Sequence, residues 1–282
     1  MIDCHAHLAD AAFDQDRSEV LARAAAAGVA AVLVVGEDHI DNQRVTHLTQ
    51  DAKARRIPLL PCLGLHPERL ADHRELPTAD EIAATLQQIR ANAPRLAAIG
   101  EVGLDYWVAK DPGRRRAQQL LLERLAALAS ELDLPLNVHS RSAGHHTVDL
   151  LLAAGARRVL LHAFDGKASH AVRAADAGYL FSVPPSVVRS QQKQKLVRRL
   201  PLDCLALESD SPVLGPDPHE RNEPANLALA RDFVAAAHGV SSQRVEEVTS
   251  ATALRLFPKL REALGGAAAD GSGPKRGRPA TE

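Results

Sequence analysis

The sequence predicts a (β/α)8 barrel, and two patterns support this prediction. Eight short, nearly continuous apolar runs alternate with longer amphipathic stretches along the chain. The runs begin roughly 20 to 40 residues apart, which is the size of a βα repeat in a parallel sheet. A doubly wound open sheet is the alternative architecture, but the first apolar run is not followed by the GxGxxG pattern of that fold. We therefore expect eight parallel strands inside a ring of helices.

Each apolar run is expected to form one strand, because a parallel sheet covered by helices has both faces of its strands buried. In chain order the runs span residues 2–7, 31–35, 59–65, 96–102, 134–138, 159–161, 179–183 and 204–207.

The amphipathic stretches predict the helices that follow the strands. In chain order these are residues 16–27, 41–54, 79–91, 114–131, 147–154, 169–177, 186–199 and 225–237. A ninth helix, at about residues 243–256, is expected to pack outside the barrel. Four helices end at a glycine that can adopt the left-handed conformation of a helix cap, namely Gly28, Gly155, Gly178 and Gly239.

Composition changes after residue 264. Residues 1–264 are expected to form one (β/α)8 domain. Residues 265–282 are rich in Gly, Ala, Pro and charged residues and are expected to be a disordered basic tail. Within the tail, Lys275, Arg276 and Arg278 resemble an AT-hook core and a minimal basic nuclear signal. A short, single tract is more often a solvating tail, so a weak tether to duplex DNA stays a hypothesis.

The overall charge excludes a large uniform positive field. The chain has 34 Lys+Arg and 35 Asp+Glu, so a polyanionic partner would have to be held locally. No apolar run of about 18 residues is present, and we expect no membrane span. The start lacks the basic and apolar regions of a signal peptide, which favours a cytoplasmic protein, with nuclear entry left open. We expect a monomer.

Polar residues gather where the predicted strands end. Six of the eight apolar runs end in an imidazole or a carboxylate: His5 and His7, His66, Glu101, His139, His162 and Asp210. Because active sites of (β/α)8 barrels lie at the carboxyl ends of the strands, these side chains should converge. Buried ionisable groups require partners, so such a set indicates a functional site.

These residue types indicate bound metal ions. His5 and His7 are two residues apart on one strand, so both rings can grip one ion. The four histidines other than His66, with two carboxylates, are too many ligands for one tetrahedral ion and enough for two ions with a shared ligand. Glu101 is the natural bridge because a carboxylate has two oxygens. Two cations roughly 3.5 to 4 Å apart suit displacement at phosphorus, with Asp210 as proton acceptor.

The cofactors are therefore expected to be two divalent ions per chain. Histidine ligation favours zinc by affinity, whereas magnesium or manganese could serve through availability. The same ligand set could polarise a carbonyl, so an amidohydrolase or lactonase acting on a small molecule is an alternative. A non-catalytic metal-dependent scaffold is the alternative from another class. No GxSxG nucleophile elbow is present in the sequence.

Several ordered motifs resemble those of the TatD-type metal-dependent deoxyribonucleases, which are (β/α)8 hydrolases of the metallo-dependent hydrolase superfamily. The motifs are IDCHAH at 2–7, GLHP at 64–67, IGEVGLD at 99–105, HSR at 139–141, LHAFDG at 161–166 and ESDSP at 208–212. The similarity covers residues 1 to about 261. It is greatest to the TatD DNase domain-containing protein 3 branch, through 137–144, 181–186 and 221–224. Ser209 stands where the family more often has Thr.

The resemblance implies one metal held by His5, His7, Glu101 and Asp210, and a second held by Glu101, His139 and His162. It also implies a position for His66 near the scissile phosphate. Glu101 stands where related amidohydrolases have a carbamylated lysine, which favours phosphodiester over cyclic-amide hydrolysis. The activities implied for DNA are 3′ exonuclease and abasic-site endonuclease, with single-stranded ends or abasic duplex as substrates.

Three side chains are candidates for substrate binding. His66 could donate a proton to the leaving oxygen or hold a phosphate, or it could be a loop histidine that caps a helix. Arg141 could clamp a phosphate oxygen or form a surface ion pair. Ser182 is expected to line the mouth of the barrel.

Overall fold

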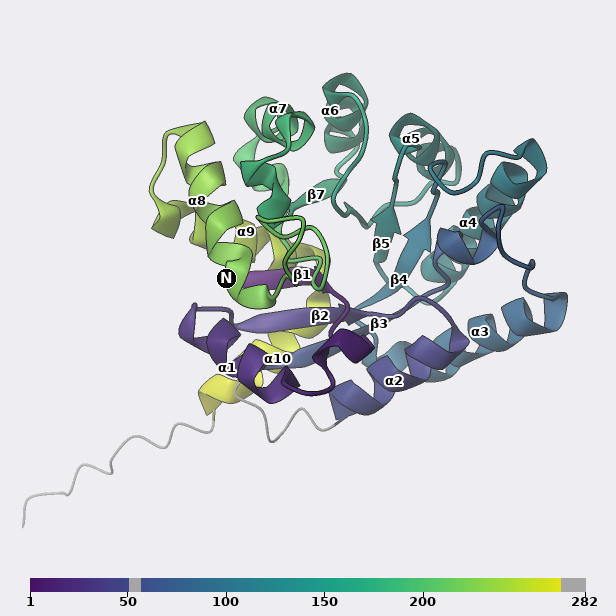
Figure 1. The fold of residues 1–282 in the computed structure, drawn as a ribbon, viewed down its shortest axis with the longest axis horizontal. Helices are drawn as coiled ribbons and strands as arrows, with labels where there is room; N and C mark the ends of the chain where they lie inside the picture. The colour runs from purple at the N-terminus through teal and green to yellow at the C-terminus, as the bar shows by residue number, and fades with distance from the viewer. Residues whose placement is uncertain (51–56, 270–282) are drawn as a thin grey trace, which may run out of the picture.

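The computed structural model describes residues 1–50 and 57–269 and confirms the (β/α)8 barrel (Figure 1). Its eight strands are parallel and hydrogen-bonded in chain order. They are β1 (Ile2–Ala6), β2 (Ala31–Val35), β3 (Leu59–Leu63), β4 (Ala98–Gly103), β5 (Leu136–His139), β6 (Val159–Leu161), β7 (Leu180–Val183) and β8 (Leu205–Leu207).

The helices form the outer layer. They are α1 (Arg17–Ala26), α2 (His39–Gln50), α3 (Ala79–Asn92), α4 (Pro112–Glu131), α5 (Gly144–Ala153), α6 (Ala168–Asp176), α7 (Gln191–Arg199), α8 (Leu227–His238), α9 (Ser242–Leu256) and α10 (Pro258–Ala269). Short 3-10 turns are η1 (Ala11–Phe13), η3 (Pro67–Leu70), η4 (Ala93–Arg95), η5 (Pro185–Val188), η6 (Leu202–Cys204) and η7 (Pro224–Asn226). The four glycines expected as helix caps all have positive φ.

Among the element boundaries that differ from the prediction, three show how apolar residues can mislead. The single helix predicted at 186–199 is wrong: η5 comes first, and α7 begins only after Ser190, whose side chain accepts the Lys193 N–H as a cap. Strands predicted from 96 and 134 begin two residues later. Leu96 still caps η4, and the Leu134 N–H donates to Ala129 of the preceding helix. The apolar residues at these two positions therefore indicate burial and not strand pairing.

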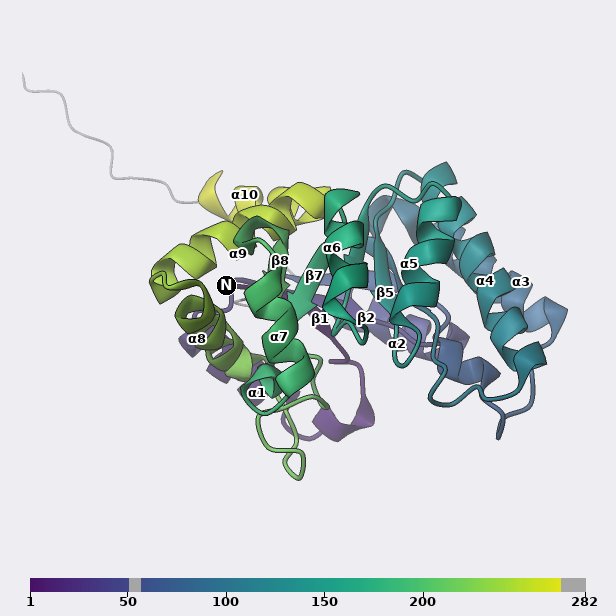
Figure 2. The same ribbon diagram turned by 90° about the horizontal axis from the view of Figure 1, so that it is seen from above.

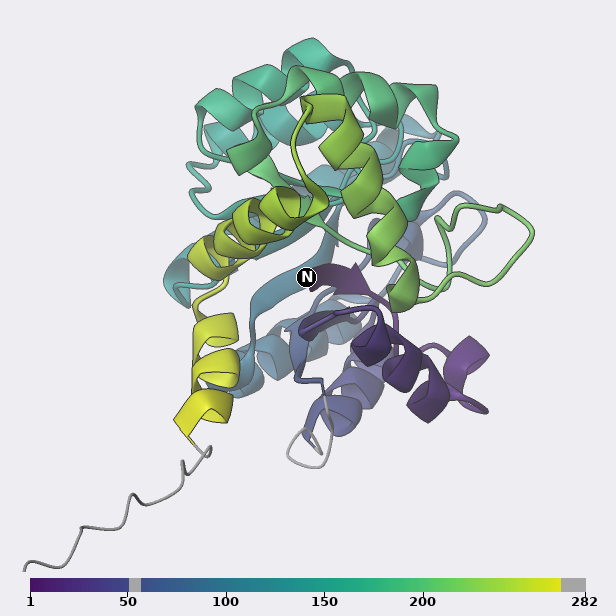
Figure 3. The ribbon, with the colours of Figure 1, turned by 90° about the vertical axis from the view of Figure 1, so that its left-hand side faces the viewer.

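Two helices close the amino-terminal end of the barrel. Interior residues such as Cys4, Leu33 and Cys62 pack against Phe257 and Leu260, which lie at the end of α9 and in α10. Figures 2 and 3 show α9 and α10 at the end of the barrel opposite the loop between β8 and α8. This packing leaves the carboxyl ends of the strands as the open end.

The barrel closes between β8 and β1 through backbone hydrogen bonds made just beyond β8. The Asp210 N–H donates to the His5 carbonyl at 2.9 Å, and the His7 N–H donates to the Ser211 carbonyl at 2.8 Å. The buried carboxylate of Asp3 accepts the Ser209 N–H at 2.9 Å. The segment that joins the first and last strands therefore carries predicted site residues.

The last described helix, α10, runs from Pro258 to Ala269 and was not predicted. The basic residues Lys275, Arg276 and Arg278 lie outside the described residues. Across residues 1–50 and 57–269, none of the helices is both long and apolar enough to cross a membrane.

Candidate metal centre

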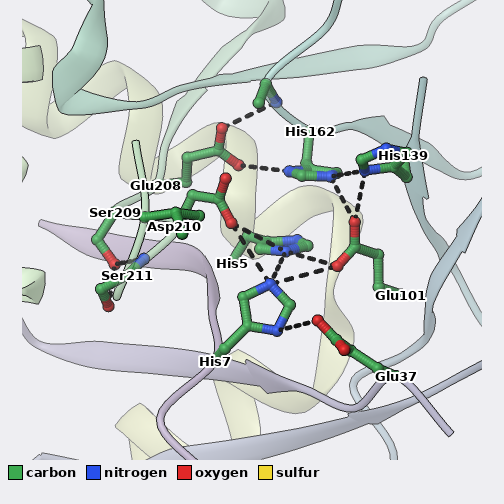
Figure 4. A network of polar contacts seen from close by, with 12 residues as sticks. His5, His7, Glu37, Glu101, His139, His162, Glu208, Ser209, Asp210 and Ser211 are labelled. Atoms are coloured by element: carbon green, nitrogen blue, oxygen red, sulfur yellow. Dashed lines mark hydrogen bonds and ion pairs between the residues drawn. The ribbon is translucent and has the colours of Figure 1, made fainter. Parts of the chain in front are cut away.

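Six predicted ligands converge at the open end of the barrel (Figure 4). They lie in or just after five strands: His5 in β1 and His7 after it, Glu101 in β4, His139 in β5, His162 after β6 and Asp210 after β8. Glu101 is the centre of the cluster, because its two oxygens face different groups of side chains. All six are buried or nearly so.

One group surrounds Glu101 Oε2. This oxygen lies 3.3 Å from the Nε2 atoms of His5 and His7, and these nitrogens are 3.3 Å from each other. Each nitrogen lies 3.5 Å from Asp210 Oδ1. Ligands about 2.0 to 2.1 Å from a tetrahedral ion would be separated by about 3.3 to 3.4 Å. The five separations therefore fit a single small cation.

A second group surrounds Glu101 Oε1. His139 Nδ1 and His162 Nε2 each lie 2.8 Å from this oxygen and 3.2 Å from each other. Two imidazole nitrogens and a carboxylate oxygen form a donor set suited to zinc and to other divalent transition metals. The geometry thus presents two adjacent donor sets joined by one carboxylate.

Hydrogen bonds fix the tautomers of two of these imidazoles. His5 Nδ1 lies 2.8 Å from Asn137 Oδ1, which can only accept because Asn137 Nδ2 donates to the Cys4 carbonyl. His139 Nε2 lies 3.1 Å from Asp105 Oδ2. In each ring the nitrogen outside the site carries a proton, so in the neutral ring the nitrogen inside has a lone pair for a metal.

His66 instead directs its hydrogen into the site. Its Nδ1 accepts the Glu68 N–H at 3.2 Å and caps η3, so the hydrogen of the neutral ring is on Nε2. That nitrogen lies 3.2 Å from Glu101 Oε1. His66 therefore both caps a helix and presents a hydrogen-bond donor to the site. A donor is suited to a phosphate or leaving-group oxygen rather than to a metal.

The cluster keeps its carboxylates charged and binds protons on its imidazoles. Burial alone would raise the pKa of Glu101, but the nearby imidazoles, led by His66, lower it well below its usual range. Burial alone would lower the pKa of His7, but Asp210 and Glu101 raise it to about 9. The pKa of His162 is raised well above its usual value by Glu101, against the effect of burial. A concentrated negative charge that attracts protons also attracts metal cations.

Two positioning residues were missed by the sequence analysis, namely Asn137 and Glu208. Glu208 is fully buried; its oxygens accept the Ala163 N–H and the Ser182 hydroxyl, and Oε2 lies 3.6 Å from His162 Nδ1. A third positioning residue, Asp105, follows β4; its Oδ1 accepts the Trp107 N–H and its Oδ2 lies 3.1 Å from His139 Nε2. Asn137 precedes His139 by two residues on the same face of β5, so strand periodicity could have identified it.

The other two substrate candidates have partners within the protein. Arg141 forms an ion pair with Asp105 at 2.8 Å, and its side chain is 44% exposed. Burial would raise the pKa of Asp105, but His139 and Arg141 lower it to about 2. Ser182 does not lie at the mouth: it is buried on the inner face of β7 and donates to Glu208 Oε2 at 2.6 Å.

Comparisons with known proteins find similar chains of nearly the same length. The family model described as TatD related DNase matches residues 2–258. Deoxyribonuclease TATDN3 of Homo sapiens is 44% identical over 94% of this chain and 97% of its own length. The 3′-5′ ssDNA/RNA exonuclease TatD of Erwinia tasmaniensis is 30% identical over 91% of this chain and 99% of its own. The crystal structure of the TatD homologue YjjV of Escherichia coli has a TM-score of 0.82 and 27% identity, covering 92% and 98% of the two chains.

Proposed function

This chain belongs to the TatD-related DNase family, and we propose that it hydrolyses DNA at a centre of two metal ions bridged by Glu101. Members of the family are named deoxyribonucleases and metal-dependent hydrolases, so the chain is a metal-dependent hydrolase of phosphodiester bonds. The observation that supports two ions is the division of Glu101: one oxygen faces His5 and His7, and the other faces His139 and His162.

The residues present fit two divalent ions, which we propose are zinc, magnesium or manganese. His5, His7, Glu101 and Asp210 would hold one, and Glu101, His139 and His162 the other. Bound there, the ions would neutralise charge on the phosphodiester and make water more acidic. Asn137 and Asp105 hold the rings of His5 and His139 through hydrogen bonds. These two rings would therefore need little rearrangement when metal binds.

Two side chains would handle protons. Asp210, whose pKa is lowered by His7 and the other imidazoles against the effect of burial, would accept the proton of the attacking water. His66, with its hydrogen on Nε2, would donate to the leaving oxygen or to a phosphate oxygen. Arg141 extends partly exposed from the ion pair with Asp105 and could contact a further phosphate oxygen.

The finer activity we propose is removal of nucleotides from the 3′ end of single strands, with abasic-site cleavage of duplex as a second activity. The relative named a 3′-5′ ssDNA/RNA exonuclease supports the first. The test uses linear single-stranded DNA labelled at either end, a closed circle of the same sequence and an abasic duplex. A ladder on the 5′-labelled strand with an intact circle supports the exonuclease, whereas a cut circle contradicts it.

Metal analysis and Glu101→Gln test the centre itself. Wild-type protein should contain two ions per chain, lose activity with a chelator and regain it when metal is added. Glu101→Gln should lose metal and turnover, because a neutral amide cannot bridge two cations well. A panel of lactones and cyclic amides tests the small-molecule alternative. Turnover of that panel without turnover of DNA would overturn the proposal, and so would full DNA hydrolysis by Glu101→Gln.

A further inference from the structure

A cavity outside the metal centre is lined by residues that follow two of the predicted ligands in the chain. It is a groove of about 900 Å³. Its walls come from the loops that follow β5 and β6 and from the start of α7. Ser142 and Asp165, which line it, each come three residues after a predicted metal ligand, His139 or His162. Three residues span at most about 10 Å, so the groove begins close to the metal centre.

The groove has an excess of positive charge. Lys167 and Lys195 line it, and within the described part of the chain neither forms an ion pair. His145 and His170 add two imidazoles, with ring centroids 5.4 Å apart. Asp165 is the acidic residue in the lining, and its Oδ2 accepts the Ser142 N–H at 2.7 Å. The two lysines are therefore free to bind an anion from solution.

Backbone donors add to these cations. The groove includes Gly144 and Ala168, the first residues of α5 and α6. Neither helix has a side-chain hydrogen bond at its N-cap, although the Gly144 N–H itself donates to the Asp165 carbonyl at 3.2 Å. First-turn N–H groups without a cap attract anions, together with the positive end of the helix dipole. Helices α5, α6 and α7 stand side by side, so their starts form one edge of the open end (Figures 1 and 2).

The opposite rim is acidic. A smaller cavity of about 260 Å³ beside His7 is lined by Asp10, Glu37, Asp38 and Asp41, with Arg44 as the cation among its lining residues. Glu37 Oε1 lies 3.5 Å from His7 Nδ1, so this rim also adjoins the metal centre. A polyanion would be attracted to one side of the centre and repelled from the other.

We propose that the groove binds the sugar-phosphate backbone of a single nucleic-acid strand whose terminal phosphodiester lies at the metal centre. The strand enters over the loops after β5 and β6 and the start of α7, and it does not continue over the acidic loops after β1 and β2. This inference rests on the proposed function and assigns the groove as the site for phosphates beyond the one cleaved.

Salt-dependent binding tests the groove. When the logarithm of the binding constant of a single strand is plotted against the logarithm of the salt concentration, it falls with a slope of about 0.7 per neutralised phosphate. Lys167→Gln and Lys195→Gln should each reduce the slope for a labelled oligonucleotide by about 0.7, and the double variant by about 1.4. Each single change should weaken binding at physiological salt by about fivefold or less, as expected for one exposed contact. Fluorescence anisotropy measures both quantities.

Arg44→Gln is the matched control, because it removes one exposed cation from the acidic rim. Its salt slope should equal that of wild type. If Arg44→Gln reduces the salt slope as much as Lys167→Gln does, the strand does not follow one side of the centre. If both lysine variants keep the wild-type slope, the groove does not bind the strand. Hydrolysis of bis(p-nitrophenyl) phosphate, which is too small to reach the groove, should not change in any of the three. If the wild-type protein does not hydrolyse that ester, the proposed function is wrong. The salt slopes still show whether the groove binds the strand.

Discussion

Asn137 provides the sharpest test of how the metal centre is built. It lies on the inner face of β5 with no exposed surface, and its amide joins two strands. The Oδ1 atom accepts from His5 Nδ1 at 2.8 Å, and Nδ2 donates to the Cys4 carbonyl at 2.9 Å. Asn137→Ala would leave both partners buried without a hydrogen bond.

The expected magnitudes follow from these contacts. Each buried group left without a partner costs about 1 to 3 kcal/mol, so the free energy of unfolding should fall by about 2 to 6 kcal/mol. His5 would also be free to rotate or to change tautomer. Loss of such an orienting partner typically weakens metal binding by about 10- to 100-fold, which equals about 1.4 to 2.8 kcal/mol.

Two measurements separate these effects. Urea unfolding of metal-free protein gives the stability change, and competition with a chromophoric chelator gives the metal affinity. Leu125→Ala, at a fully buried position of α4, is the control for destabilisation and should cost about 2 to 5 kcal/mol without changing metal affinity. If Asn137→Ala binds metal as tightly as wild type, the assigned role of the Asn137–His5 bond is wrong.

Four further results are expected. His66→Gln should keep both metals and lower kcat by about 10²- to 10⁴-fold, since His66 acts as a donor; loss of metal would refute that assignment. Glu208→Gln should weaken metal binding about tenfold, because the carboxylate faces His162; unchanged affinity by chelator competition would contradict this. Gly64→Ala should reduce metal content, because an added Cβ would lie 2.3 Å from the Glu101 carbonyl, whereas Gly155→Ala, with no atom within 4 Å of its Cβ, should affect only stability. Chelation should lower Tm and metal addition should restore it, because the ligands converge only in the folded chain; an equal Tm with and without metal would argue against a bound ion.

The sequence predicted the barrel and the convergence of the six candidate ligands because both depend on local patterns. Apolar runs mark the strands, and a polar residue at the end of a run marks the open end of a parallel barrel. The pattern was less informative where burial and pairing differ, as at Leu96 and Leu134, which are apolar but belong to the preceding elements.

Roles that depend on hydrogen-bond direction could not be predicted. The tautomer of His66 depends on the Glu68 N–H, which approaches Nδ1 only once η3 has formed. Ser182 has the residue type of a substrate contact, but its position on the inner face of β7 directs it to Glu208. The basic groove was also missed, because Lys167 precedes α6 and Lys195 lies in α7, and only the order of the strands brings the two together.

Closure of the barrel between β8 and β1 affects when the site exists during protein synthesis. The bond from Ser209 to Asp3 joins residues 206 positions apart, and the neighbouring bonds bring Asp210 to His5. A ribosome must therefore release almost the entire barrel before the last ligand can reach the first. Because domains assemble as they leave the ribosome and distant pairings form late, the nascent chain carries an incomplete donor set for most of its synthesis. Nuclease activity thus begins only with a finished fold.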